Sequence, residues 1–435
     1  MSPNGKTFTM IVSAQRTDLD KVQFIQSRMP ESGLFAEKNW LISPEPFALS
    51  GEQLESLQKL GDRLHVFAQA CNLLYRQSCE GKAPSWIAEW LDAGKPQELV
   101  EISRSKALKN QLPVLIRPDL ILTENGWALT EIDSVPGGVG LTAWLNQVYS
   151  QLGYDPIGGE HTMVDTVQRL FSHHHCVISQ EASDYRPEWE WLLGKENVYD
   201  AESYQYGDKP VYRFFENFDW ESLEELRTSW SADRQITPPL KPFMEEKLWL
   251  ALFWIKPLES FWIRELGRRY WTDLQKIIPY SWVVNPDPLP PYAVLPQLNV
   301  QSWNEVGQFS QKQRNLILKI SGFSALAWGS RGVLLGSDVS GEVWKEAIHK
   351  AMDSFSTNPY IVQEFKKGQS FEVSYWDEPS NAFKNMKGRV RICPYYFIEE
   401  NKSHLTGAMA TICPLDKKLI HGMQDAIITP VCATT

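Results

Sequence analysis

The spacing of apolar residues predicts helices in the first quarter of the chain. Between positions 54 and 73, leucine, phenylalanine and alanine recur at steps of three and four, the repeat of one helix face. A second helical segment is expected from Pro84 through Trp86 and Trp90. Neither segment gathers reactive side chains, so we interpret residues 1–110 as an N-terminal helical region with a packing role.

Strand-like sequence begins at Leu112. The apolar run 112–123 and the run 127–133 are separated by Glu-Asn-Gly, and Asn-Gly between apolar runs indicates a β-hairpin. A glycine-rich loop and a helical segment follow. We treat residues 111–149 as one hairpin unit.

The rest of the chain mixes strands and helices. Residues 150–235 hold three short strand-like runs and are expected to form a small α/β domain. Residues 236–290 are Trp-rich helices, which Pro257 should interrupt, followed by a proline-rich connector. Residues 291–435 are interpreted as a third α/β unit, with strands at 315–321, 360–365, 369–376 and 388–398. This order predicts an α/β (α+β) fold with mixed or antiparallel sheets.

Composition narrows the class of protein. Hydrophobic residues are 43% and charged residues 22% of the chain, as in ordinary globular proteins. A balance of 43 basic and 53 acidic residues argues against nucleic acid or an anionic membrane as the main partner. No apolar run is long enough for a membrane span or a secretory signal. The six cysteines show no CxxC spacing, so we expect neither a disulfide framework nor structural zinc, and a cytoplasmic location.

The hairpin carries three carboxylates and one arginine at even spacing. Arg117 and Asp119 share a face of the first strand, and Glu131 and Asp133 share a face of the second. A two-residue Asn-Gly turn would put the two pairs on opposite faces. A three-residue loop, 124–126, would instead pair Asp119 with Glu131 and Arg117 with Asp133. The three carboxylates could then share Mg²⁺; the alternative is a solvated face on which Arg117 pairs with an acid.

A second candidate site surrounds Lys319, which lies inside an apolar strand where an unpaired charge is costly. The small-residue loop after it could offer backbone N–H groups to phosphate oxygens. The loop residues in question are Ser321, Gly322, Gly329, Arg331 and Gly332. The alternative is a lysine at a strand end beside an ordinary turn. Further on, Gln363 and Glu364 could hydrogen-bond an adenine edge or a ribose.

Other patterns are weaker. Gly138-Val-Gly-Leu-Thr-Ala143 fits a dinucleotide-binding fingerprint, but the strand before it ends in charged residues and no suitable acid follows about 20 residues on. Three consecutive histidines, 173–175, cannot easily converge on one ion, so a polar helix end is expected there. His421 and Asp425 lie one helical turn apart and stay undecided between a surface pair and cleft residues.

Taken together, these features resemble the ATP-grasp superfamily, and within it the synthetase domain of glutathionylspermidine synthases and circularly permuted relatives. In that family an Arg-x-Asp strand is followed by Glu-x-Asn, and the two acids and the amide bind the Mg²⁺ of ATP. The spacing from Arg117 through Asp119 and Glu131 to Asp133 agrees, with Asp133 standing where the family has asparagine.

The resemblance implies further roles. Lys319 would cover the ATP phosphates, residues 322–333 would close over them, and Arg391 would lie near the transferred phosphate. The hinge that contacts adenine would be Gln363, Glu364 and Phe365. A further nucleotide lysine is expected just before the segment 293–296, where this chain has Tyr292, with Lys256 and Lys312 as candidate substitutes.

The function that the resemblance implies is an ATP-dependent, Mg²⁺-dependent carboxylate–amine ligase that works through an acyl phosphate. Arg117 and Arg391 would be catalytic, and Asp119, Glu131 and Asp133 would bind Mg²⁺. The hairpin 111–149 would be the metal-site part of an ATP-grasp fold, 150–235 a pre-ATP-grasp-like domain and 291–435 the nucleotide-binding domain. The expected partners are small-molecule carboxylate and amine substrates. The alternatives are a catalytically inactive MgATP-binding protein and a dinucleotide-binding α/β protein.

Overall fold

The computed structural model describes residues 16–30, 39–231, 233–327, 331–420 and 425–434. Its helices are α1 (Asp18–Ser27), α2 (Gly51–Cys79), α3 (Trp86–Asp92), α4 (Gln97–Arg104), α5 (Val139–Gln151), α6 (Thr162–Phe171), α7 (Arg186–Leu193), α8 (Glu224–Ser229), α9 (Leu248–Leu252), α10 (Glu259–Ile277), α11 (Trp303–Gly307) and α12 (Gly341–Asp353). Short 3₁₀ helices include η1 (Gln180–Tyr185), η4 (Asn217–Ser222), η5 (Pro242–Glu245) and η6 (Lys256–Leu258).

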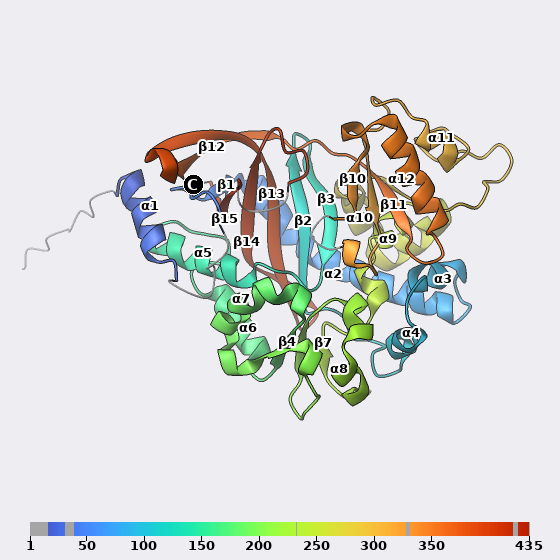
Figure 1. The fold of residues 1–435 in the computed structure, drawn as a ribbon, viewed down its shortest axis with the longest axis horizontal. Coiled ribbons are helices and arrows are strands. Elements are labelled where there is room, and N and C mark those ends of the chain that lie inside the picture. Colours follow the sequence, from blue (N-terminus) through green and yellow to red (C-terminus); the bar gives the residue numbers. More distant parts are fainter. Residues whose placement is uncertain (1–15, 31–38, 232, 328–330, 421–424, 435) are drawn as a thin grey trace, which may run out of the picture.

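The strands are β1 (Phe47–Leu49), β2 (Leu115–Thr123), β3 (Gly126–Asp133), β4 (His175–Ile178), β5 (Val198–Asp200), β6 (Val211–Phe214), β7 (Ile236–Thr237), β8 (Ser281–Val283), β9 (Leu316–Ile320), β10 (Val333–Leu335), β11 (Tyr360–Glu364), β12 (Ser370–Asp377), β13 (Ala382–Glu399), β14 (Lys402–Pro414) and β15 (Ile427–Ala433). Within the described residues they form three sheets (Figure 1). The central sheet has the order β1-β15-β14-β13-β2-β3, with β12 also paired to β13. The other two are β10-β9-β11-β8 and the parallel sheet β5-β4-β6-β7. The predicted α/β class with mixed sheets is confirmed.

The central sheet is covered on both faces. On one face α2, α9 and α10 pack against alternate residues of β2, β13 and β14. On the other face α5, α6 and α7 cover β13 and join the central sheet to the β5-β4-β6-β7 sheet (Figure 1). The long helix α2 begins with a capping box, in which Ser50 and Gln53 each accept the other's backbone N–H through a side-chain oxygen.

The β2–β3 hairpin contains a bulge that decides which way its acids face. Thr123 pairs with Gly126 across a two-residue turn, so of the two loops considered the three-residue loop 124–126 does not form. The register then shifts by one beside Asp119, which leaves Thr130 as the extra residue of β3. After the shift Asp119 pairs with Glu131 and Arg117 with Asp133, the pairing that the longer loop was expected to produce.

Two parts of the chain are organised differently from the expectation. The predicted unit 291–435 is divided, because β9, β10 and β11 belong to one sheet while β12 to β15 belong to the central sheet. The sheet that contains β9, β10 and β11 also contains β8, which lies in the predicted 236–290 unit.

Pro257 does interrupt the Trp-rich helices, within η6 between α9 and α10. No helix among the described residues has both the length and the apolar character needed to cross a membrane.

The packing of α2 on the central sheet gives a first prediction. A Cβ at Gly61 would lie 2.4 Å from the Tyr396 ring and 2.5 Å from Ser403 Oγ, whereas a Cβ at Gly51, in the first turn of the same helix, would meet nothing within 4 Å. Gly61→Ala should therefore lower the free energy of unfolding by about 1–3 kcal/mol through overpacking, despite alanine's better helix propensity. Urea unfolding compares the two variants. A Gly61→Ala protein as stable as Gly51→Ala would contradict this close packing.

Candidate active site

The carboxylates of the hairpin lie on the face of β2 and β3 that points away from α2. Trp127 and Leu129 belong to the core against α2, and Ile132 packs on that core after the bulge. Leu129 and Ile132 face the same core although they are three residues apart, so Glu131 and Asp133 point to the opposite face of the sheet. Together with Arg117 and Asp119 they line one cavity of 380 Å³, which we call the carboxylate cavity.

Asp119 is held between two arginines. Its carboxylate lies 3.2 Å from an Nη of Arg117 and 3.0 Å from an Nη of Arg391, which β13 supplies from the position paired with Ile121. The Cys393 thiol donates to the same carboxylate at 3.5 Å. Burial alone would raise the pKa of Asp119, but the two guanidinium groups outweigh it and hold this pKa below its usual value.

Asp133 also pairs with Arg117, at 3.0 Å, and accepts the Val135 N–H at 2.8 Å. Burial raises the pKa of Asp133 above its usual value, against the effect of Arg117. Arg117 therefore bridges two of the three carboxylates. The Nε–H groups of Arg117 and Arg391 are buried without an acceptor among the described residues.

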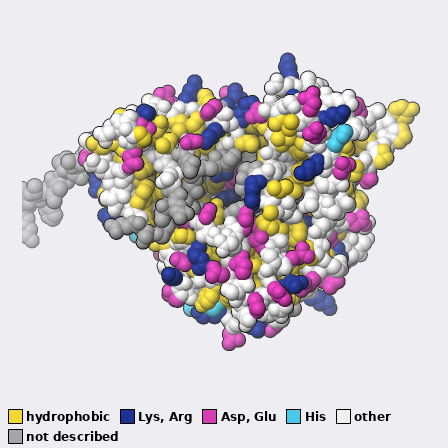
Figure 2. All heavy atoms as spheres, in the orientation of Figure 1, with side chains coloured by type: hydrophobic (Ala, Val, Ile, Leu, Met, Phe, Trp, Pro, Cys, Tyr) yellow, Lys and Arg dark blue, Asp and Glu magenta, His cyan; other side chains and the backbone are white. Residues whose placement is uncertain are grey.

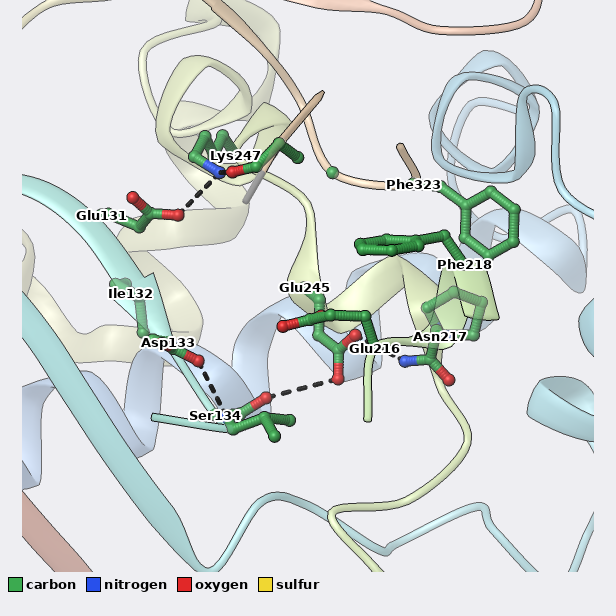
Figure 3. Close-up of a pocket in the computed structure, with 14 residues that line it drawn as sticks. Glu131, Ile132, Asp133, Ser134, Glu216, Asn217, Phe218, Glu245, Lys247 and Phe323 are labelled. Carbon is green, nitrogen blue, oxygen red and sulfur yellow. Dashed lines mark hydrogen bonds and ion pairs between the residues drawn. The ribbon is translucent and has the colours of Figure 1, made fainter. Parts of the chain in front are cut away.

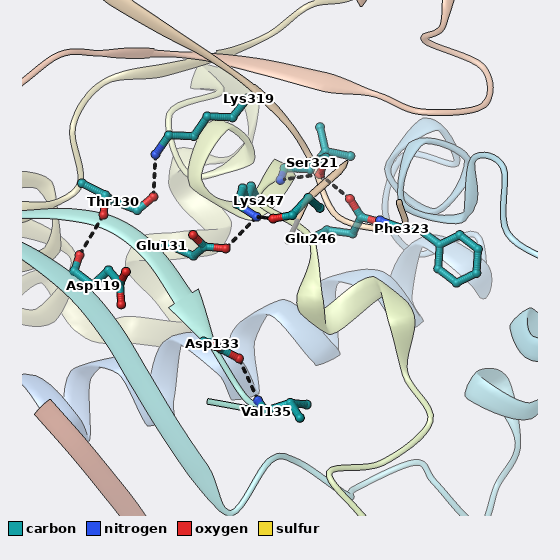
Figure 4. A network of polar contacts seen from close by, with 12 residues as sticks. Asp119, Thr130, Glu131, Asp133, Val135, Glu246, Lys247, Lys319, Ser321 and Phe323 are labelled. Atoms are coloured by element: carbon teal, nitrogen blue, oxygen red, sulfur yellow. Dashed lines mark hydrogen bonds and ion pairs between the residues drawn. The ribbon is translucent and has the colours of Figure 1, made fainter. Parts of the chain in front are cut away.

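The third carboxylate, Glu131, is paired with a lysine that the sequence analysis missed. Lys247 lies between η5 and α9, has 8% of its side chain exposed, and places Nζ 2.6 Å from Glu131 (Figure 4). Tyr292, where the family lysine was expected, is 97% exposed, and the substitutes Lys256 and Lys312 are also exposed. Lys247 follows two acids, Glu245 and Glu246, in a segment whose pattern indicates only Trp-rich helices, so the sequence carries little signal for this residue.

Lys319 approaches the hairpin from strand β9 of the β10-β9-β11-β8 sheet. Its buried Nζ donates to the carbonyl of the bulged Thr130 at 2.8 Å and to Gln363 Oε1 at 2.9 Å (Figure 4). Burial lowers the pKa of Lys319 to about 8, with Glu131 opposing this shift and Lys247 adding to it. Lys319 and Lys247 therefore form a pair of buried cations around Glu131.

The predicted adenine hinge is only partly available for a ligand. Gln363 is buried; its amide oxygen accepts from Lys319 and its amide nitrogen donates to Ser281 Oγ at 3.1 Å, so its side chain positions Lys319 instead. Glu364 pairs with Lys366 at 2.7 Å. Glu364 and Phe365 do line a smaller cavity with Lys319 and Arg391, of 90 Å³, which we call the lysine cavity.

The small-residue loop is fixed where it begins. The Ser321 hydroxyl donates to Glu246 and accepts the Leu248 N–H, while Glu246 also pairs with the buried Lys95. A Cβ at Gly322 would lie 2.8 Å from the Glu246 carboxylate, so only glycine permits this approach.

At the far end of the loop, Arg331 pairs with Glu181 at the rim of the carboxylate cavity. A Cβ at Gly332 would lie 2.6 Å from the Leu326 carbonyl oxygen. Gly329 lies outside the described residues. The loop's predicted contact with phosphate stays a prediction.

The structure also explains the weaker patterns. At the start of α5, Gly138 has a φ of 82°, and a Cβ at Gly140 would lie 2.7 Å from Glu188. The Glu188 carboxylate accepts the Leu141 N–H at 3.1 Å. The Glu188 carboxylate therefore lies at the start of α5, where a dinucleotide phosphate would bind. This disfavours the alternative of a dinucleotide-binding protein. His421 lies outside the described residues.

Glu131 stands where three cavities meet. It lines the carboxylate cavity, the lysine cavity and a third cavity of 60 Å³, the acidic cavity, which also holds Asp133, Glu216 and Glu245 (Figure 3). Burial and the neighbouring Glu245 and Asp133 raise the pKa of Glu216 well above its usual value. In the space-filling view, charged side chains of both signs surround a hollow near the middle of the molecule (Figure 2).

The donor chemistry of the hairpin suits a hard cation such as Mg²⁺, because three carboxylates face one cavity. As the side chains lie, however, no group of three His, Cys, Asp or Glu residues within the described ranges could hold a metal ion. Each carboxylate has its own cationic partner instead. Mg²⁺ binding by these residues stays a prediction, and it would require at least one of these ion pairs to be exchanged.

Comparison with known proteins establishes the fold. No family model and no curated protein sequence matches the chain. A glutathione synthetase-like effector from Globodera pallida, in its apo form, is similar over 96% of both chains, with a TM-score of 0.52 and 10% identity. A candidate γ-glutamylcysteine synthetase from Methylobacillus flagellatus aligns over 89% of both chains at 10% identity, with a TM-score of 0.39 that is too low to carry an argument. The first similarity shows a synthetase-like fold, and it does not show that the chain belongs to the glutathionylspermidine synthase family.

The two arginines around Asp119 give a prediction for stability. Asp119→Asn leaves the buried Arg391 without a carboxylate partner and should lower the free energy of unfolding by about 3 kcal/mol. Glu399→Gln is the control. Glu399 lies on the same strand as Arg391, and its ion pair with Arg169 is more exposed, so this change should lower the free energy of unfolding by less than about 1 kcal/mol. Equal losses in the two variants at pH 7 would contradict the buried role of Asp119.

The pH dependence of the same variant has a defined sign. Because the folded-state pKa of Asp119 is lowered, its stabilising contribution is present above the usual value of 3.8 and is lost as pH falls through the folded-state pKa. In Asp119→Asn, the free energy of unfolding should therefore fall less steeply as pH is lowered. Urea unfolding at a series of pH values below 5 measures this dependence. The same dependence in the variant and in wild type would assign the acid sensitivity to other groups.

Proposed function

We propose that this chain is an ATP-dependent ligase that joins a carboxylate to an amine through an acyl phosphate. The observation that carries the proposal is the convergence on Glu131. Two buried lysines, two arginines and three carboxylates from separate parts of the chain line three cavities that share Glu131. The synthetase-like fold supports this assignment at the level of architecture.

In the proposed reaction, a substrate carboxylate oxygen attacks the γ-phosphorus of ATP, the bond to the β–γ bridging oxygen breaks, and ADP leaves. An amine nitrogen then attacks the acyl carbon, the bond to phosphate oxygen breaks, and the nitrogen loses a proton. Positioning and charge stabilisation suffice for both steps, so no nucleophilic side chain is needed.

The chain's own residues have separable tasks in this scheme. Lys319 and Lys247 bind phosphate oxygens, with the lysine cavity and Glu364 and Phe365 on the nucleotide side. Arg117 and Arg391, held by Asp119, use their remaining N–H groups on the carboxylate and the transferred phosphoryl group.

The carboxylate cavity and the acidic cavity are assigned to the two other substrates. The carboxylate cavity, at 380 Å³, offers the space for the acid. The acidic cavity offers the carboxyl oxygens of Glu216, Glu245 and Asp133 as hydrogen-bond acceptors for the amine.

Mg²⁺ would be held by Asp119, Glu131 and Asp133 and would supply positive charge to the phosphate oxygens. The three carboxylates that line one cavity together with Arg117 and Arg391 support the placing of a nucleotide and its metal here.

A direct test uses hydroxylamine as a general amine. The protein is incubated with MgATP, hydroxylamine and a panel of small carboxylic acids, and ADP and hydroxamate are both measured. We expect ADP release that depends on the acid, with one hydroxamate for each ADP. Arg391→Met should lower the rate by about 100-fold or more, while Tyr292→Ala, at an exposed position, should leave it unchanged. Bound nucleotide without acid-dependent ADP release would favour the inactive MgATP-binding alternative.

The pKa of Lys319 predicts how nucleotide affinity changes with pH. A pKa near 8 means that the ammonium loses its proton as pH rises above 8, and with it the charge that attracts phosphate. Affinity for ADP should therefore fall above about pH 8, where phosphate is already fully ionised. Lys319→Arg, which stays charged, should keep its affinity to higher pH. Calorimetric titration across this range decides, and identical pH profiles would exclude Lys319 as the titrating group.

A further inference from the structure

The feature that leads further is the ion pair between Lys247 and Glu131. Glu131 lines all three cavities, Lys247 lines the acidic cavity, and Lys247 Nζ is 2.6 Å from the Glu131 carboxylate. Burial alone would lower the pKa of Lys247, but Glu131 outweighs it and keeps the lysine charged. The position that a divalent cation would take beside Glu131 is thus held by an ammonium group of the protein itself.

The other two carboxylates offer a metal no easier entry. Asp119 is bound to two arginines and Asp133 to one of them. Arg117 and Arg391 project from neighbouring strands of the central sheet and are fixed by its register. Lys247 lies on a short segment between η5 and α9, and its flexible chain makes it the cation that can move most readily.

Moving Lys247 away from Glu131 without another anion would leave a buried charge unpaired. A nucleotide phosphate supplies that anion. We propose that Lys247 masks Glu131 against divalent cations until a nucleotide phosphate takes the lysine, so that metal and nucleotide bind as a coupled pair. This inference rests on the proposed function for the identity of the nucleotide. By reciprocity, bound metal must raise nucleotide affinity by the same factor.

Lys319 provides a matched comparison. It is buried in the same site and carries the same formal charge, but its hydrogen bonds go to two neutral oxygens, Thr130 O and Gln363 Oε1. Removing Lys319 leaves the Glu131–Lys247 pair intact, whereas removing Lys247 frees the carboxylate. A mask acts through Lys247 alone, while a general field effect acts through both lysines.

The test is a titration of the full chain with Mn²⁺ in the absence of nucleotide, with free Mn²⁺ measured by electron paramagnetic resonance. We compare wild type, Lys247→Met and Lys319→Met, with Lys247→Gln as a second variant in case Lys247→Met is poorly folded. Circular dichroism checks each protein. Coupling of this kind is typically worth about 5- to 150-fold. We therefore expect at least about tenfold tighter Mn²⁺ binding in the Lys247 variants than in wild type, and at most about threefold in Lys319→Met.

Three results would overturn the mask: tight Mn²⁺ binding by wild type alone, no gain in the Lys247 variants, or an equal gain in Lys319→Met. None of these depends on nucleotide, so they can occur while AMP-PNP still binds and the ligase proposal stands. If the Lys247 variants gain Mn²⁺ affinity as expected but AMP-PNP does not raise the Mn²⁺ affinity of wild type, the coupling to nucleotide is overturned.

Discussion

The extra residue in β3 is the constraint on which the site depends. Trp127 and Leu129 are drawn to the core against α2, and in a regular ladder this would turn Glu131 and Asp133 toward the same core. The bulge at Thr130 inverts the alternation, so the carboxylates reach the cavity with Asp119. It also leaves the Thr130 carbonyl free of the ladder, and Lys319 uses that carbonyl to join the second sheet to the hairpin.

Charge balance explains much of the remaining arrangement. Arg117, Arg391 and Lys247 each neutralise a hairpin carboxylate, so the buried acids are stable without a metal. A site built this way is closed to free cations and receptive to a charged complex.

Sequence patterns predicted the fold class, because apolar periodicity is a local property, and they offered the cross-strand pairing of the acids as one of two alternatives that depended on the loop. They missed the bulge, although the three-residue step from Leu129 to Ile132 is its signature in the apolar pattern. They also misplaced the second lysine, since Lys247 acquires its role only through burial against a strand more than a hundred residues away. Gln363 was expected at the adenine, and its tertiary partners show that it holds Lys319.

If Glu131 lies in a single site for nucleotide and metal, the two ligands together should raise the thermal unfolding midpoint of the protein. The midpoint is measured for the full chain alone, with Mg²⁺, with AMP-PNP and with both. A ligand that binds only the folded state adds about 2.7 kcal/mol at a hundredfold excess over its dissociation constant. We expect the midpoint to change little with Mg²⁺ alone, and to rise with both ligands by more than the sum of the separate effects. An unchanged midpoint with both ligands at saturating concentrations would contradict a nucleotide-and-metal site at Glu131.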